Sequence, residues 1–212
     1  MKLPNEVFYF LKKLAAEDHN LTTQMTELDQ ARAAMAVWIE AFLKSLQKFD
    51  HHLFGLKVED CFFESKREDG SLKNHFGAYF AFQGKWSDYA GYYLHIAPNS
   101  SYLGGGMYKP SAPVLRKIRQ EIDFQPQTFE SIISKKSFAD TLGDLEKAST
   151  DKNPKGYPRD HPKIHLLRKQ SFFVRKMIED ETFNSEDSIS HCISIAKEIY
   201  PFNQFFNETF IS

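Results

Sequence analysis

The stretch from Gly91 to Pro110, GYYLHIAPNSSYLGGGMYKP, constrains the fold of this chain more than any other. Alternating apolar and polar residues predict β-strands over residues 91–97 and 101–103, and residues 98–100 form the turn between them. Three glycines close the second strand, and a helix is expected to begin after Pro110. The stretch therefore joins a β-rich part of the chain to a helical part.

Two more strands are predicted ahead of this stretch. Residues 74–82 alternate, with Phe76 and Phe80 on one face and His75 and Tyr79 on the other. Residues 58–65 give a further strand. Because no helix is predicted between these strands and their connections are short, the economical topology is an antiparallel meander.

Helices are predicted before and after the strands along the chain. Apolar residues recur every three or four positions in residues 7–14, 23–49, 112–122 and 186–200. Shorter helices are expected at residues 127–134, 135–142 (broken) and 161–168, and residues 202–210 are expected to pack as a final turn or short helix. Pro201 is expected to stop or kink the last helix, and residues 171–174 to be extended. We therefore predict a single α+β domain over residues 1–212, mainly an antiparallel sheet of about four to six strands flanked by helices. It would comprise N-terminal helices (about 6–49), a β-rich middle (about 58–106) and a helical C-terminal part (about 111–210).

The composition narrows the class of protein. The 212 residues include 27 basic and 28 acidic side chains, a formal net charge of −1, so we expect no general nucleic-acid binding and no membrane association. No apolar stretch reaches membrane-spanning length. The two cysteines, Cys61 and Cys192, lie far apart and suit free thiols in a reducing cytosol. We predict a soluble cytoplasmic protein that needs no metal and no cofactor.

Four segments of the chain carry a family resemblance. They are HFGAYF at 75–80, GYYLH at 91–95, the triple glycine with LRKIR at 115–119, and PKGY at 154–157 with DHP at 160–162 and LLR at 166–168. In this order they resemble the conserved hypothetical family known as domain of unknown function 2461, found in bacteria and fungi. The resemblance covers nearly the whole chain and implies no established activity.

The resemblance also implies a basic and aromatic run just before the strand at 74–82, and this chain departs from it. Glu64 stands at the first arginine of that run, Arg67 and Glu68 keep its Arg-Asp pair, and Lys73 holds its last lysine. If the run binds an anionic ligand in relatives, this chain would bind that ligand poorly or not at all. A divergent member is therefore expected.

The triple glycine is the first candidate site. Exposed backbone N–H groups at the start of a helix favour an anion, and Lys109 would add a donor. The pattern is not that of a phosphate-binding loop, however, and glycines at a strand end often mark a bulge or a close approach of two backbones. Both interpretations remain open from the sequence.

Histidines and tyrosines give further candidates. His161 and His165 have metal-ligand spacing but lack a third ligand, so we expect no metal there, and Asp160 is expected to cap a helix. His75 and His95 lie on two strands that are neighbours in the predicted meander, where they would be an acid and a base or, as we favour, half-buried structural residues. A row of tyrosines could line a groove for a ring-shaped or peptide ligand or simply reflect strand composition. The row comprises Tyr79, Tyr89, Tyr92, Tyr93, Tyr102 and Tyr108.

A basic cluster completes the hypothesis. We expect Lys66, Arg67, Lys73, Arg159 and Arg168 to meet near the glycines. The function favoured is a non-catalytic binding or interaction module with an anion-accepting, aromatic-lined face, for an anionic small molecule or a protein partner. The alternative is an enzyme acting on a phosphate- or carboxylate-bearing small molecule, with His95 or His161 as acid or base. The candidate ligand-binding residues are Arg67, Lys73, Tyr93, His95, Gly104, Gly105, Gly106, Lys109, Arg159, His161 and Arg168.

Overall fold

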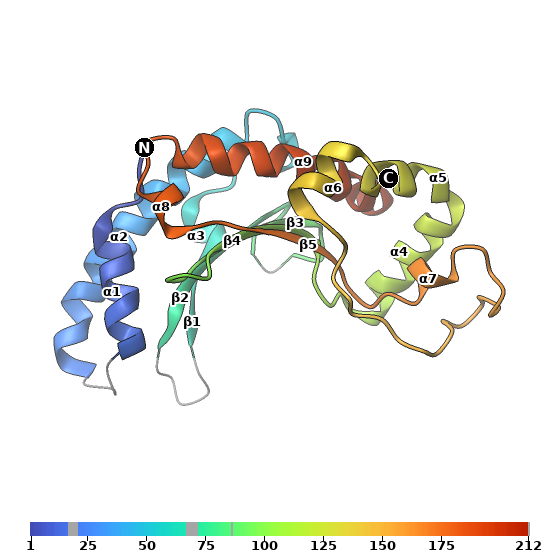
Figure 1. Ribbon diagram of the computed structural model, residues 1–212, viewed down its shortest axis with the longest axis horizontal. Coiled ribbons are helices and arrows are strands. Elements are labelled where there is room, and N and C mark those ends of the chain that lie inside the picture. The colour runs from blue at the N-terminus through green and yellow to red at the C-terminus, as the bar shows by residue number, and fades with distance from the viewer. Residues whose placement is uncertain (17–20, 67–71, 86, 212) are drawn as a thin grey trace.

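Five antiparallel strands form one sheet in the computed structural model of this protein (Figure 1), which describes residues 1–16, 21–66, 72–85 and 87–211. The strands lie side by side in chain order. They are β1 (Phe62–Lys66), β2 (Leu72–Ala81), β3 (Gly91–Ile96), β4 (Tyr102–Met107) and β5 (Phe172–Met177). The predicted meander is confirmed for β1 to β4. After a long helical excursion β5 returns beside β4 and completes the sheet.

Helices make up most of the remaining chain, and the predicted α+β class is confirmed. The α-helices are α1 (Asn5–Ala16), α2 (Leu21–Leu46), α3 (Val58–Cys61), α4 (Ala112–Phe124), α5 (Pro126–Ile133), α6 (Lys136–Leu142), α7 (Ile164–Leu167), α8 (Asp180–Phe183) and α9 (Ser188–Ile211), with a 3₁₀ turn η1 at His51–Leu53. None of the helices in the described ranges is long and apolar enough to cross a membrane.

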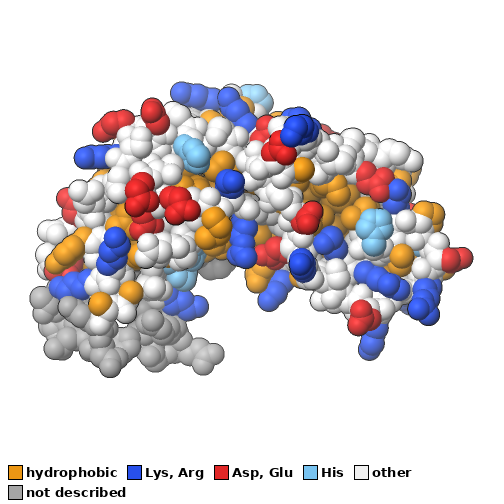
Figure 2. All heavy atoms as spheres, in the orientation of Figure 1, with side chains coloured by type: hydrophobic (Ala, Val, Ile, Leu, Met, Phe, Trp, Pro, Cys, Tyr) orange, Lys and Arg blue, Asp and Glu red, His pale blue; other side chains and the backbone are white. Residues whose placement is uncertain are grey.

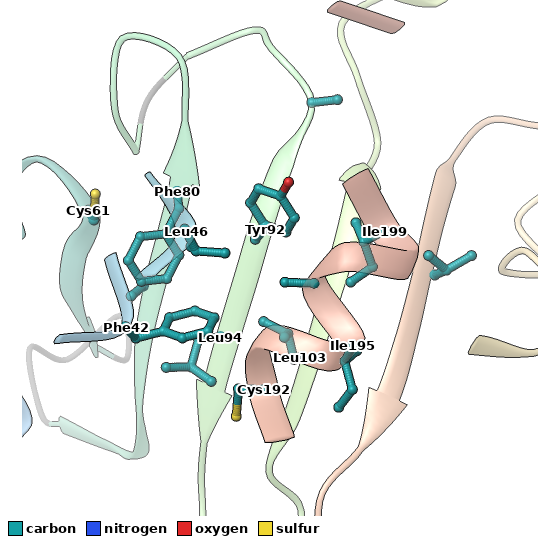
Figure 3. Packing of buried hydrophobic residues seen from close by; sticks show 14 of the residues in the cluster. Phe42, Leu46, Cys61, Phe80, Tyr92, Leu94, Leu103, Cys192, Ile195 and Ile199 are labelled. Carbon is teal, nitrogen blue, oxygen red and sulfur yellow. The ribbon is translucent and has the colours of Figure 1, made fainter. Parts of the chain in front are cut away.

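The hydrophobic core lies between one face of the sheet and the helices α2 and α9 (Figure 3). Phe80 of β2 packs edge-on against Phe42 of α2, with ring centroids 5.4 Å apart. On the α9 side, Ile195 and Ile199 lie over β4. Cys61 and Cys192 are both buried and free, as predicted.

The triple glycine occupies a different place from the predicted one. Gly104, Gly105 and Gly106 do not follow the second strand; they lie inside β4 and pair with β3 on one side and β5 on the other. A Cβ atom on Gly105 would lie 2.1 Å from Cγ2 of Ile199. Gly105 therefore lets α9 pack closely on the middle of the sheet, whereas Gly104 faces Phe173 of β5. Both glycines lie where a side chain would not fit, in agreement with a packing role.

The predicted element boundaries were also wrong near residues 58–61 and at Pro201. Residues 58–61 form the helical turn α3 rather than the start of a strand, because the Asp60 carboxylate accepts a hydrogen bond from the Lys57 N–H at 2.8 Å and fixes this turn. Pro201 does not stop the last helix, since α9 continues to Ile211. The residue that follows, Phe202, is fully buried, and this packing outweighs the local preference of proline to end a helix.

Candidate functional site

The face of the sheet away from the core carries polar and aromatic side chains. The core residues of β2 to β5 alternate with residues of this second face, which we call the open face: His75, Tyr79, Tyr93, His95, Tyr102, Phe173 and Arg175. Antiparallel pairing places Tyr79 opposite Tyr93 and His95 opposite Tyr102. Cross-strand neighbours on one face are close enough for their side chains to touch. The strands thus bring these seven residues, which are far apart in the sequence, together on one surface.

A pocket of about 450 Å³ lies on the open face, and we call it the tyrosine pocket. Gly106 lines it as a residue without a side chain. Aromatic residues supply much of the remaining lining: Tyr79, Tyr89, Tyr93, Tyr102, Tyr108 and Phe173. Pockets of this size and aromatic character are typical of small-molecule sites.

Five of the six tyrosines in the predicted row line this pocket. Tyr79 forms a fixed part of it, because its hydroxyl donates a hydrogen bond to the Tyr89 carbonyl at 2.7 Å. Burial raises the pKa of Tyr79, so its hydroxyl stays protonated at neutral pH. The sixth residue, Tyr92, faces the core and donates a hydrogen bond to the buried Asp50 carboxylate at 2.9 Å. The groove predicted from the tyrosines is present, but Tyr92 is not part of it.

Two cations and two carboxylates also line the pocket. The Lys109 ammonium lies 5.2 Å from the centre of the Tyr108 ring, and the Arg175 guanidinium 5.4 Å from that of Tyr102. Within the described ranges, no carboxylate lies within the 4.0 Å salt-bridge limit of either cation. Asp88 and Glu146 contribute the negative charges. The cations are therefore held by aromatic rings and remain available to an anionic group.

Beside the pocket, flat side chains form a stacked row across four strands. The His75 and His95 ring centroids are 4.4 Å apart, and the His95 and Tyr102 rings are stacked at 4.7 Å and 15°. Arg175 continues the row over the other side of Tyr102. The row therefore runs β2, β3, β4, β5, and we call it the histidine row.

The histidine row is neutral at its centre. The pKa of His95 is lowered to about 4. Burial is the largest cause, and electrostatic repulsion from His75 and Arg175 adds to it. Burial and the nearby Lys73 ammonium also lower the pKa of His75. Desolvation and positive neighbours both disfavour the imidazolium form. At neutral pH the open face therefore presents uncharged imidazoles between cations.

Comparison with known proteins places the chain in a family. The family model described as "Conserved hypothetical protein (DUF2461)" matches residues 6–205. The chain belongs to this family. No curated protein and no solved structure is similar enough to count as a match. The family assignment confirms the resemblance seen in the sequence but brings no activity with it, so the function of this DUF2461 protein rests on its site.

The candidate residues of this DUF2461 protein fall into three places. Tyr93, Gly106 and Lys109 line the tyrosine pocket. His95 lies in the histidine row. Lys73 lies near the same row, because its ammonium lowers the pKa of His75. Gly104 and Gly105 are enclosed within β4, where a Cβ on Gly104 would meet the Phe173 ring at 2.3 Å. The predicted glycine turn at a helix start is absent, which removes the premise of the anion cradle.

Residues 159–168 of this DUF2461 protein include three predicted site residues, Arg159, His161 and Arg168, but none of the three lines the tyrosine pocket. The His161 Nε2 atom lies 2.9 Å from an Asp123 carboxylate oxygen of α4, and its Nδ1 accepts the Lys163 N–H at 3.2 Å. Arg168 donates two hydrogen bonds to the Asn153 side chain. Asp160 does not cap α7, because the cap position is Lys163. The end of the molecule that carries α7, at the right of Figure 1, shows basic and acidic side chains interspersed in the same orientation (Figure 2).

The predicted basic cluster is not assembled among the residues that the structure describes. Neither Arg159 nor Arg168 lines the tyrosine pocket, and the side chain of Arg168 is engaged with Asn153. Arg67 lies outside the described residues, as does the side chain of Lys66. In the described part of the chain, no group of three or more histidine, cysteine or acidic side chains could hold a metal ion.

Sequence reasoning missed Arg175 and Phe173. Both come from β5, which was expected only as an extended segment ending at Val174. The alternation FFVRKM was visible in the sequence, with Phe173 and Arg175 two residues apart and therefore on one face. What the sequence could not indicate is that this strand pairs with β4, which places Arg175 opposite Gly104.

Proposed function

We propose that this protein binds a small anionic molecule with a flat ring in the tyrosine pocket and does not transform it. The observation that carries the proposal is the pocket itself, in which tyrosine rings surround a space of about 450 Å³ on a preformed sheet. Aromatic side chains bind flat rings by stacking and by burial of apolar area. Lys109 and Arg175 are the partners for the anionic group.

The geometry of the histidines favours binding over catalysis. A general base is most effective when its pKa lies near the working pH, and the pKa of His95 is about 4. Both ring nitrogens of His161 already have protein partners, Asp123 and the Lys163 N–H. The enzyme alternative with either histidine as acid or base therefore gains no support from these contacts.

The thiols also favour a binding role. Burial raises the pKa of Cys61 to about 12, and that of Cys192 likewise to about 12. A thiol with such a pKa is protonated at neutral pH and is a poor nucleophile. Two buried free thiols further suit a reducing compartment, which supports a cytoplasmic location.

The test is a thermal-shift screen with nucleotides, sugar phosphates and aromatic carboxylates at millimolar concentration. A ligand that binds only the folded protein stabilises it by about 2.7 kcal/mol at one hundred times its Kd. This stabilisation raises the melting temperature. The pocket variants are Lys109→Gln and Arg175→Gln. The matched control is Lys176→Gln, because Lys176 is exposed, adjacent to Arg175 and on the opposite face of β5.

We expect at least one compound with both a ring and an anionic group to shift the wild type and K176Q equally, and to shift K109Q and R175Q less. Compounds that have the ring without the anion should shift all four proteins weakly. The proposal is refuted if no compound shifts the wild type, or if K109Q and R175Q respond as the wild type does. The first result would favour a protein partner for the open face, and the second a ligand site elsewhere.

A further inference from the structure

A second feature of the open face lies outside the tyrosine pocket, at the β2 end of the histidine row. His75 and His95 come from neighbouring strands and stack with ring centroids 4.4 Å apart. Neither is among the residues that line the pocket. The pair is half-buried, so its rings are held by the sheet while their edges reach solvent.

The ring nitrogens of this pair have few protein partners. Among the described residues, the His75 nitrogens accept or donate no hydrogen bond, and the contact of His95 is the Tyr93 hydroxyl at 3.4 Å from Nδ1. Each neutral imidazole carries one N–H donor. Half-buried donors without a protein partner are groups that a ligand can satisfy.

Among the described residues, the charged groups that act on the pair are cations. Lys73 acts on His75 from β2, and Arg175 acts on His95 from β5. The titratable neighbours from β3 and β4 are the phenols Tyr93 and Tyr102. Of the described carboxylates, Glu146 acts on Tyr102, which lies beyond His95. The side chains of β1 after Phe62 lie outside the described residues.

We propose that Lys73, His75 and His95 form an anion subsite that takes a compact dianion such as a terminal phosphate. Lys73 supplies a fixed positive charge and the two imidazoles supply N–H donors, which together match the several oxygens of a phosphate or sulfate. A transition-metal ion, the other common ligand of paired histidines, would be repelled by Lys73 and Arg175. The subsite does not depend on the tyrosine pocket being occupied.

Binding of a dianion at this subsite is linked to proton uptake. A negative charge beside an imidazole favours its protonated form and raises its pKa. The complex therefore holds more protons than the free protein, and affinity rises as the pH falls below the raised pKa values of the complex. The increase levels off once the free histidines are themselves protonated, which for His95 is near pH 4.

The experiment is an NMR titration of the imidazole signals with sodium sulfate at constant ionic strength, from pH 5 to pH 8. Sulfate is the probe because its own charge is constant over this range, so any pH dependence comes from the protein. Inorganic phosphate is titrated in parallel at pH 8 as the biological analogue. The variants are Lys73→Ala and His75→Asn, with Lys176→Gln as the control for loss of an exposed lysine on the other face.

We expect saturable shifts of the His75 and His95 signals, higher pKa values for both in sulfate, and tighter binding at pH 5 than at pH 8. K73A should weaken sulfate binding about fivefold, as expected for loss of one partly screened charge, and K176Q should leave it unchanged. An amide spectrum of each variant verifies that it is folded. Saturable phosphate shifts at the same two residues would extend the result to the biological anion.

Three results would overturn the subsite. They are the absence of saturable shifts at the two histidines, shifts no larger than those of the more distant His51, His165 and His191, and equal affinity in K73A and the wild type. None of these results bears on the tyrosine pocket, which is tested separately by K109Q. A failed subsite and a failed pocket can thus be told apart.

Discussion

At the scale of single residues, Gly105 is the residue on which the packing of α9 depends. Its missing side chain lets Ile199 approach within the space that a Cβ would need. We expect Gly105→Ala to lower the free energy of unfolding by about 2 kcal/mol, because overpacking a rigid core forces the helix or the strand to move. The measurement is urea unfolding of the variant and the wild type.

The control is a double-mutant cycle with Ile199→Ala. Removing the Ile199 side chain relieves the clash, so the cost of Ile199→Ala should be smaller in the G105A background than in the wild type. Additive costs would mean that the strain at Gly105 arises from its other neighbours, the Gly91 carbonyl oxygen at 3.2 Å and the Asn203 Oδ1 at 3.4 Å from the same Cβ position.

Asp50 gives a prediction for pH. Burial raises the pKa of its carboxyl above 3.8, although the Tyr92 hydroxyl and the His52 N–H both donate to it. A carboxyl with a raised folded-state pKa contributes stability that is present below the unfolded-state pKa and is lost as the pH rises through the folded-state value. We therefore expect Asp50→Asn to gain stability relative to the wild type between pH 4 and pH 7. Urea unfolding across this range is the measurement, and a difference independent of pH would contradict the prediction.

At the scale of elements, the loop before α7 is held by two contacts to neighbouring helices. His161 contacts Asp123 of α4, and the Lys163 ammonium donates to the Glu130 carboxylate of α5. We expect His161→Ala to lower the free energy of unfolding by about 1 to 2 kcal/mol, since it removes a partly buried polar contact. It should leave ligand shifts in the screen unchanged.

This variant is measured by thermal unfolding and by the same compound panel, with His165→Ala as the control because His165 is exposed on the neighbouring helix. If H161A loses ligand binding at unchanged stability, His161 belongs to the site and the enzyme alternative regains support.

The elements also show which parts of the fold a sequence can indicate. The strands β2 and β3 were predicted almost to the residue, because alternation and the turn before Ser101 are local signals. The pairing of β5 with β4 was not predicted, since it joins residues that more than sixty positions separate and depends on how α4 to α7 pack. For the same reason the helix end predicted at residue 200 was wrong: the effect of Pro201 is local, whereas the burial of Phe202 is a property of the assembled core.

The residues of the candidate site also divide into those that local sequence signals could indicate and those that depend on the assembled fold. The tyrosines were found because they cluster in and near the predicted strands, but which of them share a face depends on the register of β2 and β3, which sets Tyr79 opposite Tyr93. Arg175 was missed because its place beside Tyr102 follows from the fifth strand. Arg168 was misplaced because a shared family segment says nothing about which surface it occupies, and here it binds Asn153.

At the scale of the whole molecule, α9 connects the two ends of an arched structure (Figure 1). It packs on α2 near its start and on β4, α4, α5 and α6 along its length. The N-terminus is tied to the same region, because the Leu3 N–H donates to the Phe183 carbonyl and the Trp38 indole N–H to the Ser188 hydroxyl. Segments from both ends of the chain therefore share one core, which predicts a single cooperative unit.

That unit can be tested by unfolding with two probes. In a Trp86→Phe variant the fluorescence comes from the buried Trp38, which reports on the layer of α2, α8 and α9, while far-UV circular dichroism reports on all the helices. We expect both signals to change at the same urea midpoint and with the same slope, as in two-state unfolding. The wild type, monitored by circular dichroism, shows whether the substitution itself alters stability. Separate midpoints would contradict a single domain: an earlier loss of the Trp38 signal would mean that α1 and α2 detach while the sheet, with its tyrosine pocket, remains folded.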